Sequence, residues 1–558
     1  MRTLKALSVV LALGVIPLSA FAQQPVALGK AEIVEKIVAQ ERTEMQLLRQ
    51  YSPLVETYIQ NLRPDEQRGM ALDTDKYFLG RAHLSKGVEL EPLIHSAGNK
   101  RNIFGALRNV FSTEYVPSGF LQMILLDENG FDRQHYNFAY IHREFLGEVR
   151  CLVFDVDPLV KGQKGRFVGR IWVEDQDYHI VRFNGTYNGS SRTSYYFDFD
   201  SWRQNAGRNQ WLPTFVYSEA GRGQDSPTKN LVPQAFRAQT RLWGYALGHA
   251  QEEQELSKIL VETPVKDQTD AANDYSPLQA ERSWSRLAED NVASSLERIG
   301  LMAPRGDVDN VLETVVNNLE VTNNLEIEPE VRCRVLMTST LESFTMGHTI
   351  VVSRGLMDVL PDEASLAAIL AHELGHVVLG HRMDTQFAFF SHLRFDEKET
   401  FRHFGFARTS EEEQAANQKG IELLMQSPYR DQVRTAQRFL QALQSRSKEI
   451  PNLISPHLGD RVPTTWIIAS AMPVAQPSGE RPPANAIVAL PLGGRIKVEP
   501  WNDQLQLLKS KPVGVVAEYE KMPFEVAPFM LYLTRQGDGL SAEATGAVAA
   551  KSDTEPKP

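Results

Sequence analysis

Residues 362–381 read DEASLAAILAHELGHVVLGH. The apolar residues of this stretch recur three and four positions apart, as they do on one face of a helix: Leu366, Ile369, Leu370 and Leu374. Asp362 follows Pro361 and is a favoured N-cap residue, because its carboxylate can accept a hydrogen bond from a backbone N–H of the first turn. The pattern predicts a helix that begins just after Asp362 and includes the motif HELGH.

Two histidines of this helix are one turn apart. His372 and His376 project from the same face, with Cβ atoms about 6 Å apart, which suits two nitrogen ligands of one tetrahedral zinc ion. Glu373 lies next to His372, where it can take a proton from an attacking water and pass it to a leaving amine. A single histidine is more often a core or surface residue, but the joint pattern HExxH predicts metal ligands His372 and His376 and a catalytic Glu373.

A further ligand is needed, and the nearest histidine does not supply it. On a continuing helix His381 is nine residues from His372, about half a turn round the axis, and points away. The extended motif HExxHxxGxxH is also excluded, because Leu379 and Arg382 occupy the positions of its glycine and its last histidine. The remaining common choice is a carboxylate from a later helix.

Residues 406–426, FARTSEEEQAANQKGIELLMQ, offer such a carboxylate. On a helix Glu413, Asn417 and Gly420 share one face, and the small residues would allow close approach to the first helix. Ser410 to Glu413 also fits the S-x-x-E capping box, in which Glu413 caps its own helix and binds no metal. Spacing alone leaves both roles for Glu413 open.

The rest of the chain indicates several folded parts in an α+β, multidomain protein. Alternating apolar and polar residues between 130 and 260 predict an antiparallel β-sheet domain. The predicted divisions are a signal peptide 1–22, a helical N-terminal leader 23–129, the sheet 130–260, a linker 261–279, a metallopeptidase domain 280–475, a small β-rich unit 476–535 and a disordered tail 536–558.

Charge and the N-terminus limit the function classes. With 59 Lys and Arg against 70 Asp and Glu, the net charge of −11 argues against nucleic acid as a partner. The start MRTLKALSVVLALGVIPLSAFAQQ has basic residues, an apolar run and Ala-Phe-Ala, which predicts a cleaved secretory signal. The run is shorter than the ~20 residues of a membrane span, so we expect a periplasmic or secreted protein without a span in its mature form. Cys151 and Cys333 fall in different predicted domains, and two separate thiols are at least as expected as a disulfide.

Residues from about 306 to 472 resemble zinc metallopeptidases of the Ste24/HtpX/BepA type, peptidase family M48. The likeness lies in four segments: SFTMGHTIVVSRGLMDVL, ELGHVVLGH, EQAANQKG and SPHLGDRV. The resemblance implies a mainly helical, zincin-like core with a short edge β-sheet, one zinc ion per chain, and Glu413 as third ligand. Two positions depart from the family pattern, because Asn417 replaces an aspartate and Ser455 replaces a histidine, with His457 two residues on.

These observations predict an exported zinc endopeptidase that hydrolyses unfolded or misassembled envelope proteins. An extended polypeptide substrate would pair with the TIVVS strand, residues 349–353, which the resemblance places at the sheet edge. Asn417 and Ser455 motivate an alternative, a weak or inactive metallopeptidase-like chaperone or assembly factor that binds clients through the 130–260 sheet. An exopeptidase is a third possibility, which fragment lengths would distinguish.

Overall fold

The computed structural model describes the parts of the chain that form its two main units. These parts are residues 29–65, 69–85, 87–93, 117–127, 130–160, 163, 165–188, 197–207, 210–220, 235–245, 277–381, 406–454, 458, 460–461, 496–499, 503–507, 526 and 530–535. The predicted signal peptide and the predicted disordered tail lie outside the described residues, as do Ser455, His457 and nearly all of the predicted linker.

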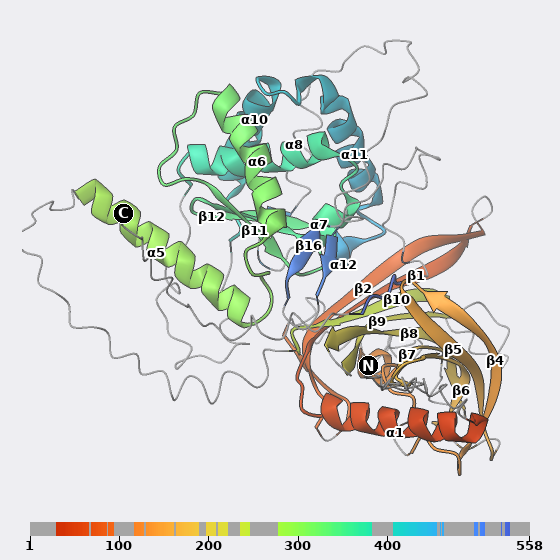
Figure 1. The fold of residues 1–558 in the computed structure, drawn as a ribbon. Helices are drawn as coiled ribbons and strands as arrows, with labels where there is room; N and C mark the ends of the chain where they lie inside the picture. Colours follow the sequence, from red (N-terminus) through yellow and green to blue (C-terminus); the bar gives the residue numbers. More distant parts are fainter. Residues whose placement is uncertain are drawn as a thin grey trace, which may run out of the picture.

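The first unit is a ten-stranded antiparallel sheet in the order β3-β2-β1-β10-β9-β8-β7-β6-β5-β4. Its strands are β1 (Leu54–Asp65), β2 (Gly69–His83), β3 (Glu89–Pro92), β4 (Tyr136–Leu146), β5 (Val149–Pro158), β6 (Phe167–Glu174), β7 (Ile180–Tyr187), β8 (Asp198–Gly207), β9 (Gln210–Ala220) and β10 (Phe236–Trp243). Helix α1 (Lys30–Leu48) lies alongside the sheet (Figure 1), and α3 (Pro117–Gln122) packs on the same core. The predicted antiparallel sheet is present, but it begins well before residue 130.

The prediction of a helical leader is wrong beyond Leu48. Val55, Tyr58 and Ile59 imitate helical spacing, yet they belong to β1. Leu54 and Tyr58 pack into the core shared with the second unit, whereas Val55 and Ile59 belong to the core that the sheet shares with α1 and α3. Because this strand is buried on both faces, its apolar residues do not alternate with polar ones, and periodicity alone cannot separate it from a buried helix.

The second unit combines helices with a four-stranded sheet, so the α+β expectation is confirmed. Its elements are α5 (Pro277–Arg298), α6 (Asp307–Thr322), β11 (Arg332–Leu336), β12 (Glu342–Met346), β13 (Thr349–Ser353), α7 (Arg354–Val359), α8 (Glu363–Val378), α10 (Ser410–Met425), η3 (Arg430–Gln432), α11 (Val433–Arg446), α12 (Pro451–Ile454) and β14 (Asp460–Arg461). Helices α6, α10 and α11 surround α8 (Figure 1), whose residues from Ala364 to Val377 are all buried.

The TIVVS strand is internal, which corrects its predicted place at the sheet edge. The strand order is β11-β13-β12-β14, so TIVVS, as β13, pairs in parallel with β11 and antiparallel with β12. Strand β14 pairs only with Glu342 and Ser343 of β12. Strand β12 therefore lies between β13 and the short β14, and it also contacts α8.

Two buried carboxylates of the large sheet hold the second unit. Glu56 of β1 accepts hydrogen bonds from the backbone N–H of Ser339, at 2.6 Å, and from its hydroxyl. Asp75 of β2 accepts from the backbone N–H groups of Asn452 and Leu453 at 3.0 and 2.9 Å. Since Ser339 lies in the loop between β11 and β12, the large sheet fixes the segment that leads into β12.

Only a small part of the predicted β-rich C-terminal unit is described. β15 (Ile496–Val498) and β16 (Leu505–Leu507) form a two-stranded sheet, and Leu505 packs into the core of the second unit. Cys151 and Cys333 are buried free thiols in different cores. Among the helices of the described ranges, none has both the length and the apolar character to cross a membrane.

Candidate metal centre

Helix α8 begins as its sequence predicts. The Asp362 carboxylate accepts a hydrogen bond from the Ser365 backbone N–H at 2.8 Å, which caps the first turn. His372, Glu373 and His376 follow in the second half of the helix, and at most 1% of each residue is exposed. The core around α8 therefore removes three polar side chains from bulk water, and such groups need specific partners.

Helix α10 excludes the capping role considered for Glu413. The capping box lies one residue earlier than predicted, between Thr409 and Glu412: the Thr409 hydroxyl accepts from the Glu412 N–H, and the Glu412 carboxylate accepts from the Thr409 N–H. Glu413 does not cap the helix and is only 5% exposed. Its carboxylate faces α8 instead of the solvent.

Small residues bring α10 and α8 together. A Cβ atom at Gly420 would lie 2.9 Å from the Ala371 carbonyl oxygen and 2.9 Å from the His372 Cα. A Cβ atom at Gly375 would lie 2.7 Å from the Ala416 carbonyl oxygen. All three distances are too short for any real Cβ, so the two glycines allow a helix contact that places Glu413 beside the two histidines.

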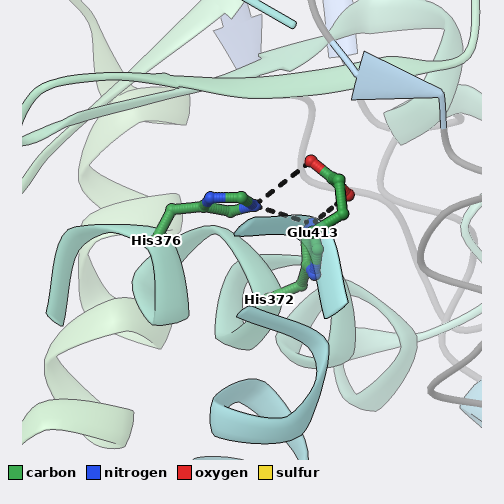
Figure 2. A group of neighbouring side chains, drawn as sticks. All are labelled: His372, His376 and Glu413. Atoms are coloured by element: carbon green, nitrogen blue, oxygen red, sulfur yellow. Dashed lines mark hydrogen bonds and ion pairs between the residues drawn. The ribbon is translucent and has the colours of Figure 1, made fainter. Parts of the chain in front are cut away.

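Figure 2 shows the His372 and His376 rings and the Glu413 carboxylate directed toward one another. The two Nε2 atoms are 3.3 Å apart, His372 Nε2 is 3.5 Å from Glu413 Oε2, and His376 Nε2 is 3.4 Å from Glu413 Oε1. Ligand atoms about 2.0–2.1 Å from a tetrahedral zinc ion lie about 3.3–3.4 Å apart. The three donors thus fit one zinc ion and have the usual nitrogen and oxygen chemistry of a catalytic site.

The outer sides of both imidazoles also contact other side chains. The Asn417 side chain lies beside the His372 ring. Burial, reinforced by the nearby His376, lowers the pKa of His372 to about 4 despite the opposing effects of Glu413 and Asn417, so this ring is neutral at neutral pH and can offer a lone pair to a metal ion. On His376, the outer Nδ1 lies 2.8 Å from Nδ1 of His381.

The position of His381 corrects the expectation that it points away. Helix α8 ends at Val378, and Gly380 adopts a positive φ of 68°, so the helical periodicity used for that prediction stops before His381. The chain turns back, and the His381 ring reaches the outer edge of the His376 ring. His381 still does not join His372, His376 and Glu413 among the converging donor atoms.

Glu373 has a partner that the sequence did not reveal. The Ser343 hydroxyl of β12 donates to Glu373 Oε1 at 2.6 Å, and both residues are buried. Nothing in the local pattern around Ser343 indicates this contact, because it depends on how β12 crosses α8. The serine orients one carboxylate oxygen of the residue that we predicted as the base.

Comparison with known proteins agrees with this geometry. Residues 305–451 match the model of peptidase family M48. No curated protein sequence matches the chain. The matched range contains α8, α10 and every residue of the three-donor group. Residues 305–451 are thus supported as a metallopeptidase domain of family M48, a family whose members are typically zinc-dependent.

Proposed function

We propose that this protein is an exported zinc endopeptidase that hydrolyses unfolded or misassembled envelope proteins. The observation that carries the proposal is the convergence of the His372, His376 and Glu413 donor atoms at separations of 3.3 to 3.5 Å, with Glu373 beside them. The match to family M48 supports the proteolytic part of the proposal. Export rests on the signal-like N-terminus, and the substrate class rests on the strand geometry described below.

The residues of the centre have three tasks in this mechanism: to hold the metal, to transfer the proton and to orient the base. His372, His376 and Glu413 hold the zinc ion, which when bound supplies the Lewis acidity that polarises a carbonyl and lowers the pKa of water. Glu373 takes the proton of the attacking water and delivers it to the leaving amine. The hydrogen bond from Ser343 keeps the Glu373 carboxylate in one orientation during both transfers.

An extended substrate pairs with β12 rather than with the internal β13. Beyond Ser343, β12 has no partner on its β14 side among the described strands. Arg408 donates to the Thr345 carbonyl oxygen at 3.1 Å, so a substrate that pairs at this position replaces that contact. Strand addition requires a free backbone, which an unfolded chain offers and a folded domain does not.

The test is incubation of the purified mature protein with zinc and casein, followed by mass spectrometry of the fragments. We expect internal cleavage that a zinc chelator stops, and much slower cleavage of a tightly folded protein of similar size. Trimming from the termini alone would identify an exopeptidase. Binding of casein without cleavage would instead favour the chaperone alternative and contradict the proposed activity.

A further inference from the structure

We infer that His381 is a positioning residue for the metal centre, which orients the ligand His376 by accepting a hydrogen bond from its Nδ1–H. The inference rests on the proposed zinc site. It concerns a histidine that belongs to none of the three donor positions and that has no part in the proton transfers described above.

A His376 ring that binds a metal through Nε2 carries its proton on Nδ1. Its Nε2 faces the other donors, 3.3 Å from His372 Nε2 and 3.4 Å from Glu413 Oε1, so Nε2 must offer its lone pair to an ion held there. A neutral imidazole with a free lone pair on Nε2 carries its proton on Nδ1. That Nδ1–H is a donor and lies 2.8 Å from His381 Nδ1. His381 Nδ1 therefore accepts, and His381 carries its own proton on Nε2.

The turn that ends helix α8 places His381 beside His376. The Gly380 N–H donates to the Val377 carbonyl, and the His381 N–H donates to the His376 carbonyl at 3.1 Å. These two bonds, with Gly380 in the left-handed region, form the Schellman motif that ends many helices. Because the motif returns the backbone of His381 to the last helical turn, its side chain lies against the outer edge of the His376 ring.

The surroundings of His372 and His376 are alike. Asn417 lies beside His372 and His381 contacts His376, so both imidazoles have a polar side chain near their outer edge. Such outer partners fix the tautomer and the ring orientation of ligand histidines, and their loss typically weakens metal binding by about 10- to 100-fold. We expect that range for the loss of His381.

The experiment compares zinc affinities by chelator competition in the full mature chain. His381→Ala should bind zinc about 10- to 100-fold more weakly than the wild type. In His381→Asn the side-chain oxygen can take the place of Nδ1 as acceptor, so most of the affinity should return. Leu379→Ala is the matched control, since Leu379 lies in the same turn and is 43% exposed. Urea unfolding of each apo variant measures any change in fold stability.

The outcomes separate this inference from the proposed function. If the wild type binds zinc and His381→Ala binds it equally well, His381 does not position His376. Equal losses in His381→Ala and His381→Asn would also overturn the inference, because an acceptor oxygen would then be no substitute. If the wild type itself fails to bind zinc, the proposed function falls and the inference falls with it.

Discussion

Glu373→Gln is expected to lower kcat for casein cleavage by about 10²- to 10⁴-fold, the usual contribution of a general acid–base residue. The amide oxygen can still accept the hydrogen bond from Ser343, so the side chain keeps its place. The amide cannot take a proton from water, which removes the base and leaves the three metal ligands intact. The measurement is steady-state kinetics on a defined peptide, with zinc content determined for the same samples.

A matched variant on the same helix controls for the chemical change. Glu363 lies in the first turn of α8, and its carboxylate accepts a hydrogen bond from the Tyr429 hydroxyl, which an amide oxygen can replace. Glu363→Gln should therefore keep wild-type activity. A Glu373→Gln variant that retains full zinc and loses less than about tenfold in kcat would show that another group takes the proton.

Gly420→Val should lower the free energy of unfolding by about 3 kcal/mol or more. This is the upper end of the range of roughly 1–3 kcal/mol that is typical of overpacked cores. The new side chain meets backbone atoms of Ala371 and His372, which cannot move unless α8 moves with them. Since α10 also carries Glu413, the same displacement should weaken zinc binding. Urea unfolding of the apo protein gives the stability change, and chelator competition gives the affinity change.

The neighbouring Gln418 provides the control, because it is exposed on the same helix. Gln418→Val introduces the same β-branched residue without a clash. It should lower the free energy of unfolding by only about 0.5 kcal/mol, because valine has a lower helix propensity than glutamine. Equal stability of the Gly420→Val and Gln418→Val proteins would mean that α8 and α10 are not in close contact.

Local patterns predicted helix α8 and the placing of His372 and His376 on one face of it, for a physical reason. The HExxH spacing, the Asp362 cap and the small residues around Glu413 act within one or two helical turns, where helical geometry fixes direction. The structure adds what spacing could not decide: the capping box uses Thr409 and Glu412, which leaves Glu413 to face α8. A threonine one residue before the predicted cap was the available signal.

Contacts between distant elements were not predictable in the same way. The contact of Ser343 with Glu373 depends on strand order, which also placed β13 inside the sheet. For β1, burial on both faces concealed the alternation that identifies a strand. His381 is different, because Gly380 was a visible helix-stop signal, and its use would have ended the helix before His381.

Zinc content of Glu413→Ala and Glu412→Ala, measured beside the wild type after identical zinc loading and dialysis, tests the three-ligand centre. We expect about one zinc ion per wild-type chain. Glu412→Ala should keep that zinc and lose only the half of the capping box in which the Glu412 carboxylate accepts from the Thr409 N–H. Glu413→Ala should keep the cap and lose the metal. Full zinc stoichiometry and affinity in Glu413→Ala would contradict the account.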